Sequence, residues 1–241
     1  MCIRDRLVND LYKEYRLDNT LNPFTYYKKR YVPVERVFLD ETEVAAIENL
    51  KIRPTNYLYD IRNIFLFEIY TGLRISDILT LKWKNFDGKC LHKTIKKTKK
   101  TIHLPLQNKA IELIEIRKRC VLRRFEINPE DYIFPYLEYD YEQVPAKTIF
   151  TAISTTTARI NKALKRIKEK ARIEKSFSTH TGRHTFSAIF LLKCNGNYYA
   201  LKEFLGHGDM KTTQTYAHML DKSKDDIIEQ LNTPTSHEVR C

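Results

Sequence analysis

The chain has 241 residues, of which 42% are hydrophobic and 30% charged, a balance that predicts a folded globular protein and excludes a disordered one. Forty-two Lys and Arg against thirty Asp and Glu leave a net charge of +12, which favours a polyanionic partner such as nucleic acid. The five scattered cysteines contain no CxxC pair, and no apolar run approaches the roughly 20 residues that span a bilayer. We therefore expect neither a disulfide framework nor a cysteine zinc site nor a membrane anchor, and place the protein in a reducing cytoplasm.

The amino-terminal segment predicts a short helix and a linker. The first six residues, "MCIRDR", read as the translated remnant of a sequencing adapter, so the natural amino terminus would be missing, and they are left out of the fold prediction. Residues 7–22 predict one helix that Pro23 ends. The basic, aromatic stretch "TYYKKRYVPVERVF" predicts a linker to the main domain. That domain opens at "LDETEVAAIENL", where Asp40 would cap a helix and Glu43 would complete a capping box.

The next elements are a central helix and a small sheet. "NYLYDIRNIFLFEIYTG" is apolar at too many positions for one exposed stripe, so its helix should be central, with Gly72 as its carboxyl-terminal cap. A shorter helix should begin near Arg74. Between Trp83 and Leu106, turn residues at Asp87–Gly88 and at "KTKK" alternate with β-branched residues, which predicts about three short antiparallel strands.

Helices dominate the remainder of the chain. "LQNKAIELIEIRKRCVLRRF" predicts a helix and "NPEDYIFPYL" a loop with at most one strand. "TARINKALKRIKEKARIEK" predicts a helix with Ile160, Leu164, Ile167 and Ala171 on one face, and its excess of Lys and Arg suits either a solvated surface or a phosphate-facing one. Short helices should follow near His180, at "YYALKEFLGH", at "KTTQTYAHM" and at "DKSKDDIIEQLN". The predicted fold class is mainly α with a small antiparallel β-sheet.

The stretch "STHTGRHTFS" crowds His180, Arg183 and His184 into about one helical turn. Positions three and four apart share a helix face, so cationic side chains would repel there unless an anion sits between them. A guanidinium offers fixed, planar donors for the oxygens of a phosphate. The crowding therefore predicts an anion-binding site, and the identity of the anion decides the function.

Five segments in this order resemble the tyrosine recombinase (phage integrase) family over roughly residues 38–220. They are "TGLRISDIL" with Arg74, "KKTKKT" with Lys97, "HTGRH", "LGH" with His207, and "TTQTYAH" with Tyr216. Each segment alone is a weak signal, and their joint order and spacing are what make the resemblance specific.

The resemblance implies a metal-independent DNA strand transesterification with a 3′-phosphotyrosyl intermediate and no cofactor. Arg74 and Arg183 would grip the scissile phosphate, Lys97 (or its neighbour Lys96) would protonate the leaving 5′ oxygen, and Tyr216 would attack. His180 and His207 would donate to the phosphate or move protons. Asp77 would brace the first arginine, and His184 would support the site.

The resemblance also implies a domain plan and partners. Residues 7–37 would be the end of a truncated core-binding domain plus linker, and residues 38–235 the catalytic domain, which resembles the DNA breaking–rejoining enzyme fold. The partner would be double-stranded DNA, bound by a homotetramer on paired sites, with the terminal "DKSKDDIIEQLN" packing on a neighbouring protomer or on its own domain. The gene would belong to a bacterium, a phage or another mobile element.

Several alternatives stay open beside this interpretation. A type IB topoisomerase-like strand transferase shares the chemistry, and a non-catalytic DNA-binding relative shares the fold and the charge. A protein-interaction module with an incidental basic face is more distant. A metal site at His180 and His184, completed by His92 or His103, lacks the H-E-x-x-H glutamate and would lie beside a repelling guanidinium. Two-metal chemistry would need clustered carboxylates, and only Asp77 and Asp209 lie near these motifs.

Overall fold

The computed structural model describes residues 3–22, 36–94, 101–123, 125–137 and 144–206. The chain divides into two compact units, residues 1–35 and 36–241. Which domains these units represent stays a prediction. Most of the predicted linker, the "KTKK" turn, and the two helices predicted after residue 206 lie outside the described residues.

The first unit contains the helix α1 (Ile3–Glu14) and the 3-10 turn η1 (Asn19–Leu21). The prediction of one helix over residues 7–22 is wrong at both ends, because the helix begins earlier and stops at Glu14. Arg16 adopts a left-handed conformation (φ 49°), which an α-helix cannot continue through. The Tyr12 hydroxyl donates a 3.0 Å hydrogen bond to the Leu21 carbonyl, so the following segment folds back along α1.

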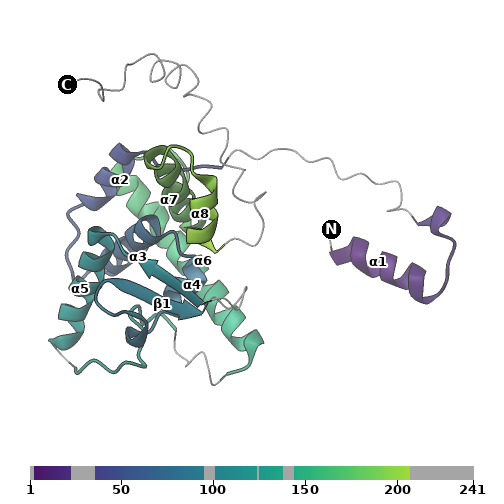
Figure 1. The fold of residues 1–241 in the computed structure, drawn as a ribbon, viewed down its shortest axis with the longest axis horizontal. Helices are drawn as coiled ribbons and strands as arrows, with labels where there is room; N and C mark the ends of the chain where they lie inside the picture. Colours follow the sequence, from purple (N-terminus) through teal and green to yellow (C-terminus); the bar gives the residue numbers. More distant parts are fainter. Residues whose placement is uncertain (1–2, 23–35, 95–100, 124, 138–143, 207–241) are drawn as a thin grey trace, which may run out of the picture. The chain divides into compact units, whose positions relative to one another are not determined.

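The second unit is built around the helix α3 (Tyr57–Thr71), which confirms the predicted central helix. Around it pack α2 (Glu41–Glu48), α5 (Asn108–Leu122), α6 (Ala146–Ala171) and α7 (Thr179–Lys193), as Figure 1 shows. Ile64, Phe65 and Phe67 on α3 are fully buried, so the helix is covered on more than one face. Such all-round burial explains why its sequence carries no polar stripe.

The predicted start of α2, the predicted end of α3 and the predicted helix start near Arg74 are confirmed, whereas α6 begins at Ala146, well before the stretch predicted to be helical. The Asp40 side chain accepts from the Glu43 N–H, and Glu43 reaches back to the Asp40 N–H, which completes the capping box of α2. Gly72 ends α3 in the left-handed region at φ 64°. The short helix α4 (Ile75–Leu79) follows at once, with Arg74 at its amino-terminal cap position.

The described residues form a two-stranded antiparallel sheet, β1 (Cys90–Thr94) and β2 (Thr101–Pro105), instead of the three strands predicted. The segment expected as a first strand is the 3-10 turn η2 (Trp83–Asn85). Its Trp83 and Lys84 N–H groups bond to the carbonyls of Asp131 and Pro129, and an isolated antiparallel bridge joins Lys82 to Tyr132, so this segment pairs with a distant loop and not along β1. Among the described residues, its pairing with β1 is an isolated antiparallel bridge between Phe86 and Leu91.

The helix α8 (Tyr198–Leu205) packs on α7 and completes the described fold. Phe186, Leu191, Leu201 and Leu205 form a small second core between these two helices. On α6, Ile160, Leu164 and Ile167 are buried as predicted, while Ala171 is half-buried. Within the described segments, no helix is both long and apolar enough to cross a membrane.

Candidate active site

Arg183 is the anchored centre of the predicted site. It lies in the first turns of α7 and is only 8% exposed. Its Nη1 donates a 2.5 Å hydrogen bond to the Gly72 carbonyl, and its Nη2 donates a 3.0 Å bond to the Leu205 carbonyl. The guanidinium therefore ties together the end of α3, the start of α7 and the end of α8, three segments far apart in the sequence.

The amino-terminal turn of α7 is held by its neighbours. The Thr179 N–H donates a 2.9 Å bond to the Asn161 side chain on α6, and the Ser178 N–H donates a 3.0 Å bond to the Thr181 hydroxyl. These contacts satisfy donors that a helix start otherwise leaves unpaired. The orientation of the whole "HTGRH" motif is thus fixed by the protein before any ligand arrives.

Arg74 lies two residues after the Gly72 carbonyl that binds Arg183, so the structure brings the chain segments of the two predicted arginines together. The Arg74 side chain is half-buried, and its Nη1 has no hydrogen-bond partner among the described residues. A buried cationic donor without an acceptor is costly unless a ligand completes it. This unsatisfied donor is what an anion-binding site requires.

The two histidines of the motif differ in exposure. His180 is exposed at the start of α7, whereas His184 is half-buried. Burial, together with the positive charges of Arg36, His180 and Arg183, lowers the pKa of His184 to about 4. His184 is therefore neutral near pH 7 and can accept a hydrogen bond without adding another positive charge to the cluster.

Sequence reasoning missed Lys93, which connects the sheet to α4. Its ammonium donates to the backbone carbonyl of Asp77 and to the Thr80 hydroxyl, the latter at 2.6 Å. Burial lowers the pKa of Lys93 to about 8, against the opposing attraction of Asp77. The period-two pattern of β1 gave a usable signal, since Lys93 shares the inward face with the buried Leu91. Asp77 itself is buried, and its predicted role as a brace for Arg74 stays a prediction.

Glu68 is a second residue that sequence reasoning missed. It is 1% exposed in the last turns of α3, and its carboxyl accepts a hydrogen bond from the Ile75 N–H. Burial raises the pKa of Glu68 well above its usual range, although the positive charge of Arg183 opposes the shift. The sequence did contain a signal for this residue, because Glu68 is a single acidic residue within "FLFEIY", an apolar stretch of the helix predicted to be central.

Three predicted site residues, Lys97, His207 and Tyr216, lie outside the described residues. Among those described, no group of three His, Cys, Asp or Glu side chains could hold a metal ion. His92 and His103, the further ligands of the alternative metal site, contact each other on the β1–β2 hairpin. His103 Nδ1 lies 3.2 Å from His92 Nδ1, and His92 Nε2 lies 2.7 Å from Asp87 Oδ2.

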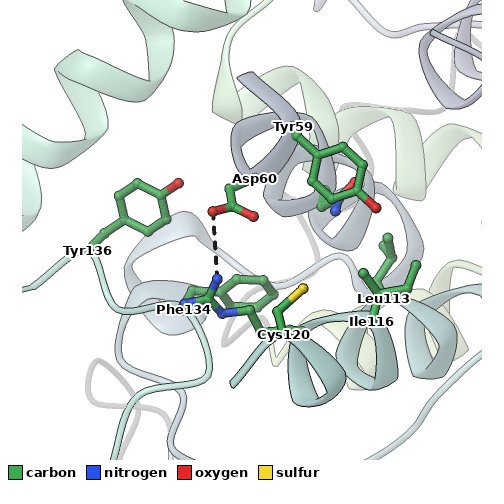
Figure 2. A pocket seen from close by; sticks show the side chains of 9 residues that line it. Tyr59, Asp60, Leu113, Ile116, Cys120, Phe134 and Tyr136 are labelled. Carbon is green, nitrogen blue, oxygen red and sulfur yellow. Dashed lines mark ion pairs between the residues drawn. The ribbon is translucent and has the colours of Figure 1, made fainter. Parts of the chain in front are cut away.

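A hollow between α3, α5 and the segment around Tyr136 is shown in Figure 2. Asp60 forms a 3.6 Å ion pair with Arg117 at this place, and burial together with the charge of Asp60 raises the pKa of Tyr136. The hollow has a volume of about 10 Å³, enough for at most one water. It is too small to be a substrate site.

Comparison with known proteins finds relatives among the tyrosine recombinases. A tyrosine recombinase of Pseudothermotoga lettingae is 28% identical over 211 residues, which cover 80% of this chain and 67% of that protein. Tyrosine recombinase XerD of Listeria monocytogenes is 30% identical over 169 residues, covering 67% of this chain and 51% of the relative. The chain thus spans between half and two thirds of the length of these curated relatives.

Solved structures share the fold. The XerA recombinase superposes with a TM-score of 0.58 at 21% identity, covering 96% of this chain and 75% of that one. The Tn1549 transposon integrase, solved in complex with circular intermediate DNA, gives 0.57 at 18% identity, covering 94% and 78%. The family model described as "Phage integrase family" matches residues 38–223, which include every predicted site residue. Because that match spans well over half of the sequence, the chain belongs to the phage integrase family.

Proposed function

We propose that this chain is a site-specific recombinase that cuts and rejoins double-stranded DNA through a 3′-phosphotyrosyl intermediate. The observation that carries the proposal is the Arg183 guanidinium bound to the Gly72 carbonyl, two residues from Arg74. This contact supports a site in which two guanidiniums face one phosphate. The net charge of +12 and membership of the phage integrase family support the same conclusion.

In the proposed reaction the Tyr216 oxygen attacks the scissile phosphorus while the bond to the 5′ oxygen breaks. The leaving oxygen takes a proton from Lys97, and the phenolic proton passes to a histidine of the site. Arg74 and Arg183 hold the non-bridging oxygens, where negative charge accumulates. The protein–DNA bond conserves the phosphodiester energy, so reversal of the same step by another strand end rejoins the DNA without a cofactor.

The arrangement lowers the cost of using a phenol as the nucleophile. A tyrosine with a pKa of about 10 is only ~0.1% ionised at pH 7, and forming the phenolate first would cost about 4 kcal/mol. Nearby cations favour the anion, and a neutral histidine can accept the proton during the attack. Each preorganised donor to the transition state contributes about 3 kcal/mol when measured by removal.

A suicide DNA substrate nicked near the cut point tests the proposal. The full chain is incubated with it in EDTA, and covalent protein–DNA adducts are separated on a denaturing gel. We expect an adduct with the wild type and with Tyr199→Phe, an exposed tyrosine on α8 that serves as the matched control. The adduct should disappear in Tyr216→Phe. Persistence of the adduct in that variant would refute the assigned nucleophile, and mobility shift without adduct would favour a DNA-binding relative.

We expect a second contact with DNA, between the phosphate backbone and basic side chains of α6. Lys162, Lys165, Arg166 and Lys170 are exposed on α6, and residues 159–175 hold eight Lys or Arg against two Glu. Each phosphate neutralised on duplex DNA contributes a slope of about −0.9 to log K against log salt. We expect affinity for duplex DNA to fall steeply between 50 and 200 mM salt by fluorescence anisotropy, by about a thousand-fold if six phosphates are contacted. A flat response would count against this surface.

Assembly into a homotetramer on paired sites is part of the proposal. A hollow of about 480 Å³ lies between α2, the end of α3 and α7, with an apolar floor that includes Val44, Ile69 and Phe190. The terminal segment "DKSKDDIIEQLN" carries Ile227, Ile228 and Leu231, which would fit an apolar floor in a neighbouring protomer. Sedimentation on DNA should show assemblies that are lost when Ile228 is changed to Asp.

A further inference from the structure

The buried Glu68 carboxyl lies between the two segments that carry the arginines. On the α4 side it accepts the N–H of Ile75, the residue directly after Arg74. Its other oxygen, Oε2, is buried without a hydrogen-bond partner among the described residues. A carboxyl group in this position is too costly to be incidental packing, because each unsatisfied buried polar atom destabilises the fold.

On the α7 side the same carboxyl lies against Gly182, the residue directly before Arg183. A Cβ atom at Gly182 would be 2.9 Å from Glu68 Oε2 and 3.2 Å from Glu68 Cγ. Only a hydrogen atom fits there, so α7 approaches α3 as closely as its backbone permits. Phe65 Cε2 would lie 3.2 Å from the same Cβ, so the Glu68 carboxyl and the Phe65 ring together lie between the Arg183 turn and α3.

We propose that Glu68 is a positioning residue of the phosphate site, whose buried carboxyl sets the spacing between Arg74 and Arg183. The inference rests on the proposed function, because the spacing matters only if both guanidiniums meet one phosphate. Glu68 itself does not touch the substrate. It acts through the backbone of Ile75 and of Gly182.

The neutral form of the carboxyl suits this role. The charged and titratable group that faces Glu68 from α7 is Arg183, and the polar group that faces it from α4 is the Ile75 N–H. Burial raises the pKa of Glu68, because it disfavours the charged form of the carboxyl. A neutral carboxyl still accepts the Ile75 N–H, whereas a carboxylate would compete with the phosphate for the charge of Arg183.

The test compares Glu68→Gln, Glu68→Ala and Leu66→Ala in the full chain. Leu66 is buried on the same helix, so Leu66→Ala controls for lost packing. Adduct formation is measured at saturating and at limiting DNA, at a temperature where all variants are folded. We expect Glu68→Ala to form adduct about 10- to 100-fold more slowly at saturating DNA, because a displacement of about 1 Å costs that much. Glu68→Gln, which keeps the shape and the acceptor, should stay within about threefold of the wild type.

Two results would overturn the proposal. A Glu68→Ala rate equal to that of Leu66→Ala would mean that the carboxyl only fills space. A Glu68→Gln rate as low as that of Glu68→Ala would mean that the negative charge is what matters. Amide NMR of the DNA-free protein provides a readout that does not depend on cleavage: Glu68→Ala should shift the Ile75 and Arg183 signals, and Leu66→Ala should leave them in place. A wild type that makes no adduct but shows this pattern would reject the proposed function alone.

Discussion

Gly72→Ala probes the turn on which both arginine segments depend. Gly72 has φ +64°, and an added Cβ would lie 2.4 Å from Phe186 Cδ1 and 2.9 Å from Leu205 Cδ2. The left-handed conformation costs an L-residue about 1–2 kcal/mol, and overpacking of a filled core costs about 1–3 kcal/mol. We therefore expect the free energy of unfolding to fall by about 2–5 kcal/mol.

Gly88→Ala is the matched control. Gly88 also has a positive φ, +102°, but nothing lies within 4 Å of its added Cβ, so only the conformational cost of about 1–2 kcal/mol applies. Urea unfolding can be followed by the fluorescence of the single tryptophan, Trp83, which is 8% exposed. Equal losses in the two variants, within about 0.5 kcal/mol, would refute the steric part of the reasoning.

Three further predictions concern charged groups of the site. Arg183→Lys should lower the free energy of unfolding by about 1–3 kcal/mol, because one ammonium cannot replace both bonds to the Gly72 and Leu205 carbonyls; an unchanged urea midpoint would contradict this. The folded-state pKa of His184 is about 4 against 6.5, so the unfolded chain binds a proton first and the wild type should lose up to about 3 kcal/mol between pH 6.5 and 4. His184→Gln should flatten that acid loss in urea titrations at several pH values. The folded-state pKa of Lys93 is about 8 against 10.5, so its burial cost is present below pH 8 and relieved as pH rises toward 10.5. Relative to Lys93→Met, the wild type should therefore gain stability over that alkaline range, and a constant difference would contradict the shift.

Features set by neighbouring residues were predictable from the sequence. The Asp40–Glu43 capping box and the Gly72 cap depend on side chains and backbone conformations within a few residues of each other. The central position of α3 followed from its continuous apolar run. The family resemblance predicted that the chain segments of Arg74 and Arg183 lie close together in the fold, and no local sequence pattern would have predicted this.

Features that depend on distant partners were not predictable. The segment at Trp83 precedes the Asp87–Gly88 turn, as a first strand would, but its N–H groups bond to the carbonyls of Asp131 and Pro129, far along the chain. Lys93 and Glu68 were passed over because an isolated charged residue is ordinarily solvated. Only the folded structure reveals that Lys93 reaches the end of α4, and that Glu68 lies against the turn that carries Arg183.

The partners of Arg183 explain how a buried cation can remain available to an anion. Gly72 is the carboxyl-terminal cap of α3, and Leu205 is the last residue of α8, so both carbonyls lie at the negative ends of helices. These partial charges stabilise the guanidinium and fix its plane, yet they leave its formal charge uncancelled. A carboxylate in their place would cancel that charge. Burial of Glu68 raises the pKa of its carboxyl and so disfavours its negative charge, which acts in the same direction as recruiting two helix ends: the site holds its arginine rigidly while preserving the positive charge that a DNA phosphate would meet.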